Sequence, residues 1–131
     1  MTPRARSGED GNSTVEFTLV SVLVVTLFLV VMQVGFVLHT RNVLVASAQE
    51  GARFGANADR GPADAQLRTR EVVASALSGR AAARMDYSAA EVVHDGVLTM
   101  EVTIAGPLPL LFLPVGPMAL TVQGHALEER R

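Results

Sequence analysis

Cysteine, tryptophan and lysine are all absent from this chain of 131 residues, and aromatic side chains make up only 5% of it. Without cysteine there is no disulfide framework, no thiol nucleophile, no thiolate metal site and no cysteine-linked lipid anchor. With so few large side chains, a small domain builds a thin core from Val, Leu and Ala, which gains stability from a membrane or partner subunits. The formal net charge of −2, with arginine supplying all eleven basic residues, does not indicate nucleic-acid binding.

Sequence patterns for catalysis and cofactor binding are also missing. There is no glycine-rich phosphate-binding loop, no G-x-S-x-G motif and no pair of carboxylates that can be placed on one face. Three histidines, His39, His94 and His125, stand apart in the chain and lack the spacing of metal ligands. We therefore expect no enzymatic activity, no metal or other cofactor and no small-molecule substrate.

The longest charge-free run extends from Phe17 to Leu38 and contains 22 residues. At about 1.5 Å per helical residue, it is long enough to cross roughly 30 Å of hydrocarbon. Its few hydroxyl groups can bond to the backbone of their own helix, so they cost little there. The run is too long for the apolar core of a signal peptide, and a core helix without a polar face does not suit so small a domain. We predict one retained membrane-spanning helix from about Val15 to Leu38.

Beyond the membrane the helix is expected to continue as a stem that ends at about Ala58. The stem has a face of small side chains, formed by Val43, Ala46, Ala48, Ala52 and Gly55–Ala56. Small residues let helices approach closely, so this face suits either contact with another helix or packing on the chain's own domain. The residues alone favour neither reading. Glu50 and Arg53, three positions apart, can form a surface ion pair.

A second helix is predicted after the break at Gly61–Pro62, because proline suits the first turn of a helix and Asp64 suits its positive end. Its apolar stripe is expected to include Leu67, Val72 (or 71–73 generally), Ala76 and Leu77. We expect this helix to end at Ser78–Gly79, with a frayed turn in the segment 80–85.

The C-terminal part switches to the alternating pattern of a half-buried strand. Between Val97 and Ala105, the side chains predicted to share one face are Leu98, Met100, Val102 and Ile104. The preceding Asp95–Gly96 pair is a strong hairpin signal, with 89–94 as the partner strand, and a third strand fits 118–127. The expected fold class is α+β, with a long N-terminal transmembrane helix that continues as a stem, a second helix and a small three-stranded antiparallel sheet.

Four prolines interrupt the apolar segment 106–117. Proline excludes a central strand or a stable helix there. An apolar loop of this kind suits contact with a partner or the bilayer surface, or folding over the sheet. The sequence does not decide between these positions.

One carboxylate, Glu16, lies immediately before the charge-free run. An unpaired carboxylate is costly inside hydrocarbon. On charge alone, Glu16 suits the headgroup level, where the positive start of a helix favours a negative charge. Its neighbours add a second reading, because Gly11 to Phe17 has the form G-x-x-x-x-E-F at the head of an apolar helix.

The segment from Gly11 to Phe17 resembles the processing site of type IV pilin-like proteins, in which a prepilin peptidase cuts after the glycine. The TadE-like proteins of tight-adherence (Tad) pili are similar to this chain in two elements, a V-E-F block before a long apolar run and a later A-x-E-G-A-R motif. Here the later motif contains Glu50, Gly51, Ala52 and Arg53. Many relatives carry a proline a few residues into the span, where this chain has Ser21.

The resemblance implies a structural or assembly protein, a minor pseudopilin of a Tad-type pilus that acts through helix–helix assembly. It implies a leader peptide at 1–11, a transmembrane helix and stem at 12–58 and a small exported α+β domain at 59–131. Cleavage after Gly11 would make Asn12 the new N-terminus. Glu16 and Phe17 would then serve recognition and assembly, with the Glu16 carboxylate paired to the new amine of a neighbouring subunit.

The implied partners are the membrane, the prepilin peptidase and other pilin-like subunits or pilus assembly machinery. The implied location is the bacterial cytoplasmic membrane, with the N-terminus in the cytoplasm and the C-terminal domain outside, or a surface pilus. The alternative is a plain single-pass adaptor or small complex subunit with no pilus role. A mature chain that starts at Asn12 would separate the two.

Overall fold

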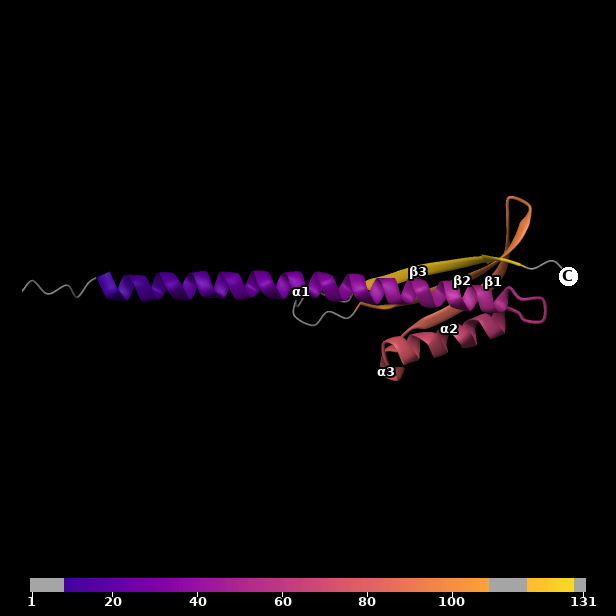
Figure 1. Ribbon diagram of the computed structural model, residues 1–131, viewed down its shortest axis with the longest axis horizontal. Coiled ribbons are helices and arrows are strands. Elements are labelled where there is room, and N and C mark those ends of the chain that lie inside the picture. The colour runs from indigo at the N-terminus through magenta and orange to yellow at the C-terminus, as the bar shows by residue number, and fades with distance from the viewer. Residues whose placement is uncertain (1–8, 109–117, 129–131) are drawn as a thin grey trace, which may run out of the picture.

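The computed structural model describes residues 9–108 and 118–128, with side chains from residue 11 onward. The elements follow in the order α1 (Glu9–Gly55), α2 (Pro62–Ala76), α3 (Gly79–Ala83), β1 (Asp86–His94), β2 (Val97–Pro107) and β3 (Ala119–Leu127). In Figure 1, α1 is one rod whose N-terminal half stands alone, while α2 and the sheet lie along its C-terminal half. The predicted α+β fold, with a long N-terminal helix, further helices and a three-stranded antiparallel sheet, is confirmed.

Helix α1 begins at Glu9, earlier than the start predicted near Val15. No proline separates these two positions, so nothing in the backbone stops the helix from starting before the charge-free run. The helix then continues without a break to Gly55, three residues before the predicted end. Ser21 keeps its backbone amide available to the helix, which a proline at this position would not do.

Hydroxyl side chains in the charge-free part of α1 bond to their own helix, as predicted. In each case the hydroxyl donates to the carbonyl oxygen four residues earlier, at 2.7–2.8 Å. The three pairs are Thr18 to Thr14, Ser21 to Phe17 and Thr26 to Val22. These hydroxyls therefore need no water, which suits an apolar environment.

The sheet has the strand order β1-β2-β3, and both neighbouring pairs are antiparallel. Asp95 and Gly96 join β1 to β2 with φ angles of 50° and 80°. Two consecutive positive φ angles are what a tight hairpin turn of type I′ requires, and Asp-Gly is among the pairs that adopt them most readily. The predicted hairpin is thus confirmed, although β1 begins at Asp86, three residues before the predicted partner strand.

One face of β2 is buried against the helices. Met100, Val102 and Ile104 are at most 1% exposed, as their alternation predicted. Leu98 was expected on the same buried face, but 41% of it is exposed. Figure 1 shows the reason, because the turn end of the β1–β2 hairpin stands clear of α1 and α2.

Helix α2 packs on α1 through small residues. The predicted apolar stripe of α2 is wrong at Leu67 and Ala76, which are exposed, whereas Leu77 packs against the core. The buried residues of α2 are Ala65, Thr69 and Val73, whereas Leu67 is 61% exposed. Spacing of four residues places the buried three on one face. Small side chains occupy this face because they let the backbones of α1 and α2 approach each other closely.

Local hydrogen bonds fix the ends of the short elements. At the start of α2, the Gly61 amide donates to the Asp64 carboxylate at 3.1 Å, as expected for an acidic residue at the positive end of a helix. At the start of α3, the Ala81 amide donates to the Ser78 hydroxyl at 3.0 Å.

The Tyr87 hydroxyl of β1 donates to the Ala82 carbonyl at 2.9 Å. Burial raises the pKa of Tyr87, and the charge of Arg70 opposes that rise.

The proline-rich segment predicted as an apolar loop lies mostly outside the described residues. Its first residues, Gly106 and Pro107, are the last two of β2. The Leu108 amide donates to the Met118 carbonyl at 2.8 Å, which closes the ladder between β2 and β3. Residues 109–117 are not described, so the predicted positions of this loop stay predictions.

Gly124 of β3 lies directly on the backbone of α1. A Cβ atom at this position would overlap the Ala48 carbonyl group and the Gln49 amide. We predict that Gly124→Ala lowers the free energy of unfolding by about 1–3 kcal/mol, because backbone atoms cannot move aside as a side chain can. Urea unfolding of the full chain in detergent, followed by circular dichroism, measures this. Gly61→Ala is the control, because a Cβ there meets nothing within 4 Å. Equal stability of the two variants would contradict the prediction.

Candidate functional site

The residues predicted to form the processing site occupy the first turns of α1. Gly11, Asn12, Glu16 and Phe17 are all helical and exposed, and 73% of Phe17 is accessible. Space around Gly11 is open, since a Cβ added there meets nothing within 4 Å. The structure therefore places these four residues together in the first turns of α1, with their side chains exposed.

Glu16 lies four residues after Asn12 on this helix. Residues at this spacing lie on the same helix face, with their Cβ atoms about 5–6 Å apart. A positive charge at position 12 and the carboxylate at position 16 would therefore stand on one stripe of α1. That stripe is exposed, so a charge on another molecule can also reach Glu16.

The charge-free part of α1 presents its apolar side chains outward. Only 6% of its most apolar 18-residue window is buried. The polar Gln33 is 3% exposed, whereas its apolar neighbours Met32 and Val34 are about half exposed. This is the reverse of a helix that faces water. By its length and apolarity, α1 fits a single-pass membrane protein.

The stem of α1 is the part that the domain covers. Buried positions recur at intervals of three and four residues along it, at Leu44, Ser47, Ala48, Gly51, Ala52, Gly55 and Ala56. Ala46, expected on this face, is exposed. Of the two readings of the small-residue face, packing on the chain's own domain is the one that the structure has.

The second motif, Glu50 to Arg53, connects the stem to α2. Gly51 lies against α2, where a Cβ atom would overlap the Thr69 hydroxyl and lie 2.9 Å from the Ala65 carbonyl oxygen. Ala52 is fully buried and Arg53 is exposed. This motif and Glu16 are 34 residues apart on one straight helix, or about 50 Å, so they do not form one site.

Charged side chains at this contact pair across the two helices. Glu50 pairs with Arg68 of α2, at 3.3 Å between Oε1 and Nη2, rather than with Arg53 as predicted. Arg68 also approaches Glu71 at 3.6 Å. The ring of Phe54 lies 3.7 Å from the guanidinium carbon of Arg60. Spacing within one helix could not identify these partners. Arg68 lies in α2 and Arg60 lies between α1 and α2, so both contacts join α1 to residues outside it.

The fold also brings together two histidines that are far apart in the sequence. The rings of His94 and His125 have centroids 6.2 Å apart, and His125 Nδ1 lies 3.5 Å from Glu101 Oε2. The strand register explains the second contact, since Glu101 and His125 are direct cross-strand partners. Within residues 9–108 and 118–128, no group of three His, Asp or Glu residues is arranged to hold a metal ion.

Two variants separate packing from charge in the stem motif. We predict that Gly51→Ala lowers the free energy of unfolding by about 1–3 kcal/mol, because it pushes α1 away from Thr69 and Ala65. Glu50→Gln should cost less than about 1 kcal/mol, because its ion pair with Arg68 is well exposed to water. Urea unfolding of the full chain in detergent gives both values. A larger loss for Glu50→Gln than for Gly51→Ala would show that charge, not close packing, holds the two helices.

Part of the chain is similar to a known protein family. No curated protein and no solved structure shows a significant similarity to the chain. The matching segment begins at the predicted cleavage residue, Gly11, and ends at the last residue of the stem motif, Arg53. It covers about a third of the chain. Over residues 11–53 the sequence matches the family model of TadE-like proteins, which confirms the resemblance predicted from its two motifs.

Proposed function

We propose that this chain is a minor pseudopilin of a Tad-type pilus, inserted in the membrane and assembled through α1. The observation that carries the proposal is the match of residues 11–53 to TadE-like proteins, a family of pilus structural proteins. That match covers both the part of α1 that the fold leaves bare and most of the stem. Proteins of this family are not enzymes, and the work of this chain is accordingly structural.

The bare part of α1 supports assembly through this helix. Large apolar side chains along it, from Phe17 to Leu38, are mostly exposed. A surface of this kind is not stable in water, so it needs either lipid or other apolar helices around it. In the membrane it has lipid, and in a filament it would have the same segment of neighbouring subunits. The small-residue face of the stem, by contrast, is occupied by α2 and β3 and is not available for such contacts.

Glu16 is the proposed recognition residue of the assembly. Cleavage after Gly11 gives Asn12 a positively charged amine at the head of the helix. Between apolar helices an unpaired carboxylate is strongly disfavoured, so Glu16 has to meet a positive charge. The amine of a neighbouring subunit satisfies it only in the correct axial register. Phe17 stands beside it and is exposed for contact with the peptidase or the next subunit.

This proposal divides the chain into three parts. Residues 1–11 are the leader, 12–58 are the transmembrane helix and stem, and 59–131 are an exported domain. The leader stays in the cytoplasm and the domain lies outside the cell membrane. The proposed partners are the prepilin peptidase and other pilin-like subunits or assembly components.

The alternative is a single-pass adaptor with no role in a pilus. One observation favours it: the small-residue face of the stem is buried in the chain's own domain, so this face is not available for contacts between subunits. The two functions differ in processing, because only the pseudopilin has to lose its leader.

Processing is tested by sequencing the N-terminus of the protein extracted from membranes of a host with an active prepilin peptidase. We expect a mature chain that starts at Asn12. Gly11→Val should abolish this product, because the cut requires a small residue before the bond, and should leave the full-length chain in the membrane. Gly8→Val, three residues upstream, is the matched control and should be processed as the wild type. A chain that keeps residues 1–11 in this host would favour the adaptor.

Assembly is tested with Glu16→Gln, which removes the charge and keeps the shape. We expect normal cleavage at Gly11, but roughly ten-fold less protein recovered in the sheared pilus or pilus-assembly fraction, because the amine of the neighbouring subunit loses its partner. Quantitative immunoblotting of that fraction measures this. Glu91→Gln, an exposed carboxylate on β1, is the control and should assemble normally. Equal recovery of all three proteins would remove Glu16 from the assembly mechanism.

A further inference from the structure

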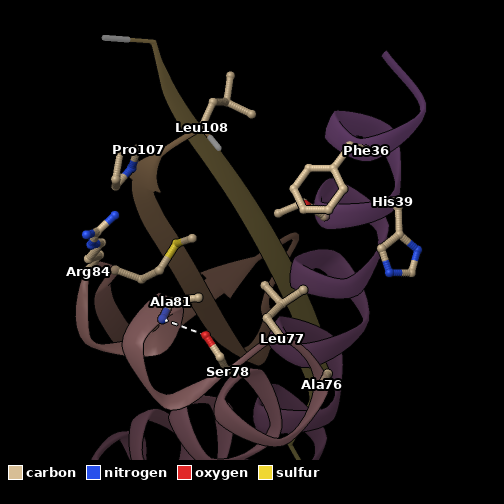
Figure 2. Close-up of a pocket in the computed structure, with 11 residues that line it drawn as sticks. Phe36, His39, Ala76, Leu77, Ser78, Ala81, Arg84, Pro107 and Leu108 are labelled. Carbon is tan, nitrogen blue, oxygen red and sulfur yellow. Dashed lines mark hydrogen bonds between the residues drawn. The ribbon is translucent and has the colours of Figure 1, made fainter. Parts of the chain in front are cut away.

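A cavity of about 390 Å³ lies where the bare part of α1 meets the domain. Figure 2 shows its walls: Phe36 comes from α1, Leu77 follows α2 and Leu108 follows β2. Arg84, which follows α3, stands on the side opposite α1, beside Pro107. The walls are therefore mostly apolar, with one permanent positive charge at the edge.

The position of α1 fixes the level of this cavity relative to a bilayer. Phe36 belongs to the charge-free run, which ends at Leu38 and is followed by His39 and then Arg41. A run of this length places Phe36 at the edge of the hydrocarbon and Arg41 in the headgroup layer. Figure 1 shows α3 at the end of the domain nearest the bare part of α1. The cavity thus lies between the hydrocarbon and the headgroups.

The charges around the cavity have one sign. None of the described residues that line it is an aspartate or glutamate. The lining residues with a basic side chain are Arg84 and His39. Within the described part of the chain, the Arg84 guanidinium forms no hydrogen bond or ion pair. Its planar donors match a phosphate group, which can accept two of its N–H bonds at once.

We propose that this cavity binds an anionic phospholipid. Arg84 binds the phosphate, while Phe36, Leu77 and Leu108 contact the upper part of an acyl chain. A cavity of this size lies within the usual range for small-molecule sites. A net anionic headgroup is favoured because none of the described lining residues is a carboxylate that could pair with the positive group of a zwitterionic lipid. The proposal depends on the proposed function only in requiring that α1 span a bilayer.

Native mass spectrometry of the full chain in detergent, with phosphatidylglycerol or phosphatidylcholine added, tests the proposal. We expect the wild type to retain one phosphatidylglycerol, with roughly ten-fold preference over phosphatidylcholine. Both lipids offer a phosphate to Arg84, but the choline cation of phosphatidylcholine cancels the net negative charge that Arg84 attracts. Arg84→Gln should lose this preference. Arg80→Gln is the matched control, because Arg80 lies in α3 but does not line the cavity.

A second variant tests the apolar walls without touching the charge. Ala76 lines the cavity and is exposed, so Ala76→Phe should fill part of the space at little cost to folding, which circular dichroism checks. It should lower phosphatidylglycerol retention while Arg84 stays in place. Three results would each overturn the lipid site. The first is an equal loss of phosphatidylglycerol preference in Arg84→Gln and Arg80→Gln, and the second is unchanged phosphatidylglycerol retention in Ala76→Phe. The third is a wild-type dimer that Ala76→Phe dissociates, because a second copy of the chain would then occupy the cavity.

Failure of this proposal can be told apart from failure of the proposed function. If carbonate washing releases the chain from membranes, α1 does not span them, and both proposals fall. If the chain stays in the membrane but shows no dependence on Arg84, only the lipid site is wrong. If the leader is never removed but phosphatidylglycerol binding depends on Arg84, the lipid site stands without the pilus function.

Discussion

Close packing between the stem of α1 and its two neighbours holds the domain together. Gly51 and Gly55 face α2, and Gly124 of β3 faces the α1 backbone, at distances that leave no room for a Cβ atom. Three contacts of this kind bring backbones within touching distance, so packing between them is extensive even though the side chains are small. These contacts determine where the sheet packs on α1. They also determine the position of the domain along α1 relative to its bare part.

This packing gives one helix two different surroundings. The stem has its small-residue face covered by its own domain, while the segment before it is left with exposed apolar side chains and a buried Gln33. Because α1 is continuous from Glu9 to Gly55, the domain is held rigidly to the segment that enters the membrane. Any assembly through Glu16 and its neighbours would therefore also place the domains, and any lipid near Arg84 would be held at a fixed level.

Some of the fold follows directly from local sequence, and some does not. The hairpin at Asp95–Gly96 was predictable because two adjacent residues decide the turn. The buried face of α2 was not: Leu67 has the more apolar side chain, but Thr69 faces α1 because only a small residue fits opposite Gly51. Glu50 likewise had an obvious neighbour three positions away, yet it pairs with Arg68 from another helix. Both errors concern partners that are distant in sequence.

The sequence by itself determined the long apolar helix, the strand alternation and both motifs of the TadE-like segment. These depend on run length, period and short spacing, all of which are local. Only the tertiary structure decided which side of the stem is covered, that Gly51 is a packing residue, and that Arg84 and Phe36 line opposite sides of one cavity. The physical reason is that a close contact depends on the shapes of two surfaces. These surfaces belong to elements that are distant in sequence, so neither segment alone predicts the contact.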